Sequence, residues 1–218
     1  MTRRFLVAML VVCSQVSFTL HASAQLAGRS LSCDGPFRPN ASATSLAEFF
    51  GSTNVVSAEI DVGEGFTEPG TVVFADTPAD RVEVLWMDKT TERGPLRVTL
   101  RAGGASRPAS HWRTPGGLTL GIHLRELERL NRRPFRLLGF AWDYEGTVMS
   151  WGGGGLDTGQ PSGCRIRARL TTGELLNDLQ RRGYKQVIGD HEFSSGHPAM
   201  QALDPFVHEL WLDYERAR

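Results

Sequence analysis

The stretch GTVVFADTPADRVEVLWMD, residues 70–88, decides how the rest of the chain is interpreted. Two apolar, β-branched runs, 70–76 and 81–88, flank a segment whose Pro, Asp and Thr are typical of a turn. Similar runs, NVVSAEIDV (54–62) and LRVTLRA (96–102), stand before and after them. The four runs predict consecutive antiparallel strands joined by short connections.

A short helix is predicted before these strands, in SATSLAEFFG (42–51). Ser45 is its expected N-cap and Gly51 its expected stop. Its apolar positions at helical spacing are Leu46, Phe49 and Phe50. A helix of this length cannot persist alone, so its apolar stripe must pack on a sheet.

A second helix and a second set of strands follow in the same order. GLTLGIHLRELERLN (117–131) predicts a helix that ends at Asn131 and Pro134. Its apolar side consists of Ile122, Leu124, Leu127 and Leu130. The strand-like runs after it are FRLLGFAWDY (135–144), GTVMSW (146–151) and CRIRARL (164–170).

Two matches between these halves predict an internal duplication. The sequence Gly-Thr-Val-Val at 70–73 recurs as Gly-Thr-Val-Met at 146–149. Each half also reaches a strand in which arginines alternate with other residues: Arg97 and Arg101 in the first, then Arg165, Arg167 and Arg169 in the second. We therefore expect an N-terminal helix-plus-sheet unit (25–102), a polar joint (103–110) and a C-terminal helix-plus-sheet unit (111–218).

The remaining segments complete the expected fold. TTGELLNDLQRRGY (171–184) predicts a third helix with Thr172 as cap and Gly183 as stop. Its inward positions are Leu175, Leu176 and Leu179. FVHELWLDY (206–214) predicts a last strand. The predicted class is α+β: an antiparallel sheet or sheets with two or three short helices packed on one face, in a tandem helix-plus-meander arrangement.

Residues 1–24 predict a secretory signal peptide, because basic MTRR, the apolar run FLVAMLVV and Ala22-Ser23-Ala24 have the required order. The alternative is an ordinary buried helix. The apolar run is shorter than the roughly 20 residues that span a bilayer, so no transmembrane anchor is expected. Cys13 lacks the small preceding residue of a lipoprotein signal. The predicted location is periplasmic or secreted.

Cleavage after residue 24 would set the net charge and the number of cysteines of the mature chain. Losing Arg3 and Arg4 would leave 22 of 24 basic side chains against 24 acidic ones, a charge near −2 that does not indicate nucleic-acid binding. It would also leave two cysteines, Cys33 and Cys164, which predict one disulfide in an oxidising compartment. The alternative is two separate thiols, with Cys164 metal-bound or reactive.

The run GDHEFSSGHPAM (189–200) concentrates groups that could do chemistry. Its histidines are six residues apart, with glycine and proline in the run, so they do not form a zinc-protease helix. Its serines lack the GxSxG pattern of a hydrolase. Candidate metal ligands from the run are Asp190, His191 and His197, with His208 as a possible fourth. The alternative is a polar connection into the last strand.

Binding residues are predicted on two strand faces. Alternation along 135–144 would place Leu138, Phe140, Trp142 and Tyr144 together, with Trp151 across a hairpin. That face is a binding surface if open, and core if a helix covers it. The arginine strands either bind an anionic ligand, such as an envelope polymer, or are solvated. The candidate ligand-binding residues are Trp142, Tyr144, Trp151, Arg165 and Arg167.

The order of helix, glycine turn and meandering strands, repeated, resembles the tandem modules of secreted β-lactamase-inhibitor proteins. The run Leu120-Gly121-Ile122-His123-Leu124 is similar to the start of small outer-membrane assembly lipoprotein domains. Three patterns, GL-x-LG, RPF and WDY-x-G-x-V, resemble exported bacterial proteins of uncharacterised function. These resemblances imply a compartment and no activity, and no binding residues can be transferred from them.

The leading hypothesis is therefore a non-enzymatic binding protein, periplasmic or secreted, that engages a protein or cell-envelope component without a cofactor. It depends on the signal peptide, the arginine and aromatic strand faces, and the lack of a recognised catalytic set. The alternative is a small hydrolase or metal-dependent enzyme that uses Asp190, His191, Glu192 and His197.

Overall fold

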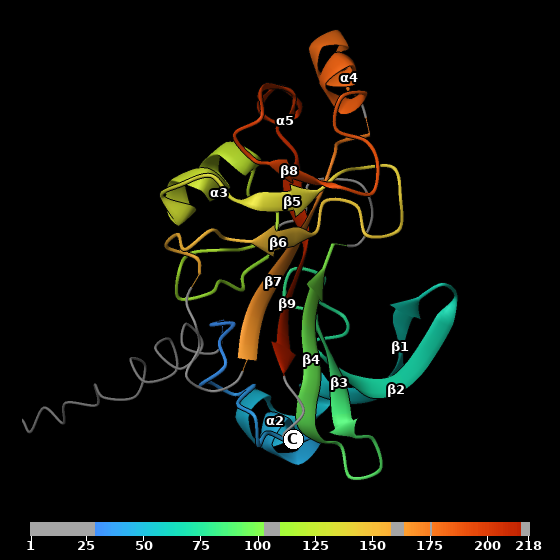
Figure 1. The fold of residues 1–218 in the computed structure, drawn as a ribbon. Helices are drawn as coiled ribbons and strands as arrows, with labels where there is room; N and C mark the ends of the chain where they lie inside the picture. The colour runs from blue at the N-terminus through green and yellow to red at the C-terminus, as the bar shows by residue number, and fades with distance from the viewer. Residues whose placement is uncertain (1–28, 103–109, 158–163, 175, 215–218) are drawn as a thin grey trace, which may run out of the picture.

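The computed structural model describes residues 29–102, 110–157, 164–174 and 176–214. Over these ranges the chain forms two antiparallel sheets and several short helices, an α+β fold as predicted (Figure 1). The predicted signal peptide, Cys13, Leu175 and all but Ser110 of the predicted joint lie outside the described residues.

The larger sheet has six strands in the order β1-β2-β3-β4-β9-β7. Their bounds are β1 (Val55–Gly63), β2 (Phe66–Val73), β3 (Val82–Asp88), β4 (Arg93–Arg101), β9 (Phe206–Tyr214) and β7 (Cys164–Thr171). Strands β1 to β4 form the predicted meander. Strand β9 pairs with β4 on one side and β7 on the other, so the two predicted units share one sheet.

The smaller sheet has the order β6-β5-β8, with β5 (Arg136–Leu138), β6 (Val148–Ser150) and β8 (Glu192–Ser194). The predicted strand over 135–144 is wrong beyond Leu138. A Cβ on Gly139 would lie 2.5 Å from the carbonyl oxygen of Gly189, so only glycine fits there. The chain then leaves β5, and Phe140 forms a parallel bridge with Ile188.

The first predicted helix is confirmed, and the second is confirmed in its C-terminal half. Helix α2 (Ala43–Phe50) ends at Gly51, and α3 (Leu124–Asn131) buries Leu124 and Leu127, while residues 117–123, with Ile122, precede the helix. The N-cap of α2 is Ser42 and not Ser45, whose hydroxyl instead completes a capping box. A single 3₁₀ turn, η1 (Ser52–Asn54), joins α2 to β1.

The third predicted helix is shorter than expected. Helix α4 (Asp178–Tyr184) begins after its N-cap Asn177, not at Thr172, and Leu179 is exposed. Gly183 lies inside α4, where an added Cβ would be 2.8 Å from the Ala199 carbonyl oxygen. The glycine therefore permits close packing on α5 (Pro198–Leu203) and does not end the helix.

The described residues contain two buried hydrophobic clusters. The larger one lies on one face of the six-stranded sheet and extends under the smaller sheet. The smaller sheet, α3 and α5 lie at one end of the molecule and α2 lies at the opposite end (Figure 1). The polar atoms of the larger cluster are satisfied: Trp86 Nε1 donates to Thr71 Oγ1 at 2.9 Å, and Trp112 Nε1 donates to the Asp80 carbonyl oxygen at 2.7 Å. This face, the core face, is closed.

The predicted disulfide is present between Cys33 and Cys164, which are 131 residues apart. Both cysteines are buried, and Tyr214, opposite Cys164, donates its hydroxyl to the Phe37 carbonyl oxygen. The N-terminal arm is thereby attached to β7 and β9. None of the helices in the described ranges combines the length and apolarity needed to cross a bilayer.

The tandem duplication is not confirmed. After α2, four consecutive strands enter the six-stranded sheet; after α3, β5 and β6 enter the smaller sheet, and only β7 and β9 join the larger one. The equivalent Gly-Thr-Val runs thus belong to strands of different sheets, β2 and β6.

Candidate functional site

The 189–200 run is described in full, and its candidate groups point to different partners. Glu192 pairs with Arg136 on β5 at 3.2 Å. His197 caps α5, accepting from the Ala199 N–H at 3.2 Å, while the His191 ring packs on Phe193. Across the described residues, no three His, Cys, Asp or Glu side chains are placed to hold a metal ion.

Ser195 in the same run is fully buried and occupied. Its hydroxyl accepts from the Phe135 N–H at 2.9 Å and also contacts the Glu128 carboxylate. Gln201 donates to the other Glu128 oxygen at 2.9 Å and to the Ser195 carbonyl at 2.9 Å. These bonds join α3, β5 and α5, so the serine acts as a structural link.

The predicted aromatic set separates. Trp142 and Tyr144 lie in the loop after β5, with ring centroids 5.6 Å apart, and Tyr144 is exposed. The indole of Trp142 donates to the Gly139 carbonyl at 3.0 Å. Trp151 is buried against Phe135 in the core. The strand alternation that would have joined these residues fails because β5 ends at Leu138.

The arginine strands, in contrast, are brought together. In the ladder β4-β9-β7, Arg97 and Arg165 lie opposite Asp213, while Arg101 and Arg169 lie opposite Glu209. Thr99 and Arg167 lie on either side of Trp211 in the same way. Directly opposed residues share a face of a sheet, so these side chains cover the face opposite the core, here called the open face.

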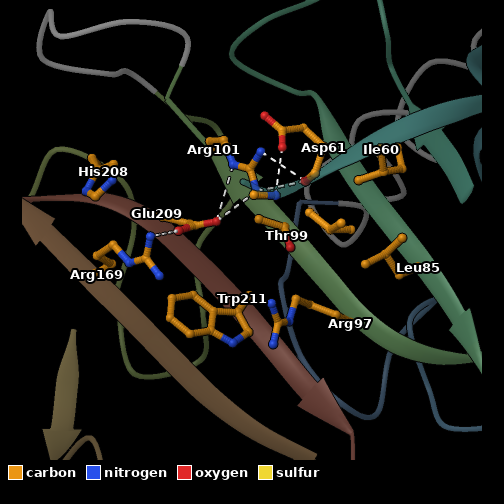
Figure 2. A pocket seen from close by; sticks show the side chains of 12 residues that line it. Ile60, Asp61, Leu85, Arg97, Thr99, Arg101, Arg169, His208, Glu209 and Trp211 are labelled. Atoms are coloured by element: carbon orange, nitrogen blue, oxygen red, sulfur yellow. Dashed lines mark hydrogen bonds and ion pairs between the residues drawn. The ribbon is translucent and has the colours of Figure 1, made fainter. Parts of the chain in front are cut away.

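A cavity of about 300 Å³ lies on the open face (Figure 2). Its lining comes from β4, β9 and β7 on one side, and from residues 60–63 of β1 and Leu85 of β3 on the other. The charged or titratable side chains that line it are Asp61, Arg97, Arg101, Arg169, His208 and Glu209. Three guanidinium groups in the lining thus meet two carboxylates, and just outside the lining Asp213 lies 3.8 Å from Arg97 and Glu83 lies 3.9 Å from Arg101.

Glu209 organises one end of this cavity. Its carboxylate lies 3.1 Å from Arg101 and 3.5 Å from Arg169, and its side chain is only 11% exposed. Arg101 also donates to the Asp61 carbonyl oxygen at 3.4 Å, which fixes the end of β1 over the sheet. Arg169 donates from Nε to Thr147 at 3.3 Å. At this end, positive charge is already compensated (Figure 2).

The other end is different. Arg97 places its guanidinium 5.7 Å from the centre of the Trp211 ring, and its nearest carboxylate, Asp213, is 3.8 Å away. Trp211 is 8% exposed, yet its Nε1 is buried and has no hydrogen-bond partner among the described residues. Figure 2 shows the nitrogen-bearing edge of Trp211 turned toward Arg97. At this end a buried donor without a partner among the described residues therefore lies beside a half-exposed guanidinium.

His208 stands at a β-bulge. Arg169 pairs with Glu209 and Leu170 with Val207, so His208 is the extra residue of β9. Its Nδ1 is buried without a hydrogen-bond partner in the described chain. Burial lowers the pKa of His208, and the Arg169 charge lowers it further, against an opposing effect of Glu209. The lowered pKa favours the neutral imidazole.

Sequence reasoning missed Trp211 and Glu209, which it treated only as parts of a last strand, and it named His208 only as a candidate metal ligand. A signal was present: Glu209, Trp211 and Asp213 alternate with the apolar Leu210 and Leu212. These three residues recur at every second position, as the arginines of β7 do, and Glu209 and Asp213 have the opposite charge. Their pairing with β4 depends on contacts across about a hundred residues, which the pattern alone does not identify.

Comparisons of this chain with protein-family models, curated proteins and solved structures give no match. The resemblance to tandem inhibitor modules and assembly lipoproteins therefore stays a prediction.

Proposed function

We propose that this protein is a non-enzymatic binding protein of the periplasm or the secreted fraction, and that the open-face cavity holds an anionic group of a cell-envelope component. The observation that carries the proposal is the buried Trp211 Nε1, which has no hydrogen-bond partner among the described residues and lies beside the guanidinium of Arg97.

Physical chemistry supports an anion at that position. A buried donor that lacks a partner costs about 1–3 kcal/mol, so a ligand that supplies the acceptor recovers this free energy on binding. Hydrogen bonds to a charged group are stronger than neutral ones, and a guanidinium fork fits two oxygens of one group. Arginine and tryptophan are also the side chains that most often carry binding energy.

The compartment is supported by the Cys33–Cys164 disulfide, because such bonds persist in oxidising environments. The first 24 residues support it too, because their basic, apolar and small-residue segments have the order of a secretory signal peptide. Mass spectrometry of the protein from a cell-envelope fraction tests this part. We expect a mature chain that starts at Gln25, and a chain retaining Met1 would contradict export by cleavage.

Binding can be followed at Trp211 itself. The chain has five tryptophans, so a ¹⁵N spectrum has five indole signals, and Trp211→Phe assigns the one of interest. We expect sulfate, acetate or galacturonate, titrated at constant ionic strength, to shift this signal saturably. Arg97→Gln should weaken that binding by about tenfold or more, since it removes a charged donor.

Arg93→Gln is the matched control, because Arg93 is an exposed arginine at the other end of the same strand, outside the cavity lining. It removes the same charge and should leave binding unchanged. A Trp211 signal that no anion moves, or equal effects of the two substitutions, would refute the proposed site.

A further inference from the structure

The two ends of the open-face cavity offer a ligand different chemistry. At one end Glu209 compensates Arg101 and Arg169 at 3.1 and 3.5 Å. At the other end Arg97 has its nearest carboxylate at 3.8 Å, beyond hydrogen-bond distance, and is adjacent to the buried, unpaired Trp211 Nε1. A ligand anion is therefore expected at the Arg97 end, where Trp211 Nε1 is unsatisfied within the described chain.

The charge of the lining limits the charge of the ligand. The lining side chains Arg97, Arg101 and Arg169 face Asp61 and Glu209, and two further carboxylates lie just outside the lining: Asp213 is 3.8 Å from Arg97 and Glu83 is 3.9 Å from Arg101. Positive charge is therefore not in excess around the cavity, and a ligand with one negative charge is repelled less than a dianion. A second negative charge would meet these carboxylates, and like charges at close range in a partly desolvated site are strongly unfavourable.

The donors also suit a flat group. The guanidinium of Arg97 presents parallel N–H groups in a plane, and the indole of Trp211 adds one more at its edge. Two oxygens in a plane, as in a carboxylate, can accept from both side chains. A tetrahedral dianion would bring a second negative charge, which the carboxylates around the cavity disfavour.

The wall beside Arg97 is apolar. Leu85 lies directly opposite Arg97 across the β3–β4 ladder, and it packs with Ile60 and Val72 in a small hydrophobic cluster. Leu85 and Ile60 both line the cavity. At about 300 Å³ the cavity is at the small end of ligand sites, so the body of the ligand is a single ring or a short chain.

We infer that the ligand is a small organic monocarboxylate with an apolar or ring-shaped body, whose carboxylate accepts hydrogen bonds from Arg97 and Trp211 Nε1. The body lies against Leu85 and Ile60. This inference depends on the proposed function, because it specifies the class of anion that the same cavity binds.

Three probes that share a phenyl ring test it: benzoate, benzamide and phenyl phosphate. They share one ring and differ in charge, since phenyl phosphate is a dianion at pH 8, above its second pKa of about 6. The readout is the dissociation constant from the Trp211 indole signal of the full protein at pH 8. Benzoate is expected to bind about tenfold or more tightly than either of the other probes.

Substitutions sharpen the test. Arg97→Lys keeps the charge but loses the fork, and should weaken benzoate about tenfold, while Arg93→Gln should not change it. Glu209→Gln should improve phenyl phosphate relative to benzoate, because it removes one of the repelling charges. If Glu209→Gln fails to fold, Asp61→Asn removes a charge at an exposed position instead.

The outcomes separate the two proposals. Phenyl phosphate binding as tightly as benzoate, or benzamide doing so, would overturn the monocarboxylate inference and leave an anion site or a neutral-ligand site respectively. Benzoate failing to move Trp211 while sulfate moves it would overturn the inference alone. If no probe and no simple anion moves Trp211, the proposed function fails as well.

Discussion

On the core face of the six-stranded sheet, Trp86 donates its indole N–H to Thr71 at 2.9 Å; on the open face, the similarly buried Trp211 has no acceptor within the described residues. The same contrast holds more widely. In the described chain, three buried side-chain atoms lack a hydrogen-bond partner: Glu83 Oε2, His208 Nδ1 and Trp211 Nε1. Glu83 lies opposite Thr99, and all three belong to the strands of the open face.

The contrast indicates different roles for the two faces. A core is stable when its polar atoms are paired, because each unpaired one costs about 1–3 kcal/mol. The core face meets this condition with its own residues. On the open face, by contrast, buried polar atoms stay unpaired within the described residues, next to a cavity lined by arginines. An unpaired buried group calls for an explanation, and a bound ligand that pairs with it is one.

The largest effect that we expect lies on the core face. Replacing both cysteines, Cys33→Ser with Cys164→Ser, should lower the free energy of unfolding by about 2–5 kcal/mol, because the bond closes a loop of 131 residues. Urea unfolding of the oxidised protein and the variant measures it. The open-face control on the same strand is Arg167→Gln, expected within about 0.5 kcal/mol of the wild type. A double variant equal to that control would contradict the assignment.

The two tryptophans provide the most direct comparison. Trp86→Phe should cost about 1–3 kcal/mol, since it removes packing and leaves Thr71 without its donor. Trp211→Phe should cost less than about 1 kcal/mol, because losing an unpaired N–H offsets part of the lost packing. Both are read from urea midpoints. Equal costs would show that Trp211 has a partner in the free protein.

The compensated end of the open face should respond differently from the Arg97 end. Glu209→Gln is expected to destabilise the protein by about 1–2 kcal/mol, because Arg101 and Arg169 lose a nearly buried common carboxylate. The control is Glu68→Gln, which breaks an exposed pair with Lys89 and should cost less than about 0.5 kcal/mol. Thermal unfolding of both variants measures the two costs. If Glu209→Gln costs no more than Glu68→Gln, Glu209 contributes only as much as an exposed ion pair.

The smallest effect concerns pH. Because burial lowers the pKa of His208, the unfolded chain binds this proton more tightly than the folded one. The stabilisation is complete above the unfolded pKa of about 6.5 and is lost as pH falls from there through the lowered folded value. Glu209, Arg169 and Glu145 face the ring and set the balance.

A comparison of urea midpoints at pH 7.5 and 5.5 tests this. The wild type should lose more stability between the two than His208→Gln does. If the two lose equally, His208 does not carry the pH dependence of the open face.

Local patterns predicted most of the fold, because alternation and helix caps act over a few residues. The strands of the meander, α2 and α3, and the terminal β9 were expected close to where they are found. The failures came from distant contacts. β5 ends where the backbone near Gly189 approaches Gly139, and Gly183 is required by α5, neither of which is visible in the local pattern.

The candidate site was predicted only in part, for the same reason. The sequence indicated that the arginines of β4 and β7 lie on strand faces, but it did not indicate which residues lie opposite them in the sheet. Their opposition to Glu209 and Trp211 exists only in the registered ladder. The bulge that brings His208 to the cavity shifts that register by one residue, which no periodicity predicts.

The central place of β9 also has a consequence for the order of events in the cell. β9 follows both of its neighbours in the chain, and the Arg101–Glu209 contact joins residues 108 positions apart. Until β9 has been synthesised, the edges of β4 and β7 that pair with it have no partner strand, and the larger sheet cannot form completely. Sheets that depend on such distant pairings form slowly. Under the export proposed above, we expect the nascent chain to stay unfolded long enough to cross the membrane, and to close its sheet only afterwards.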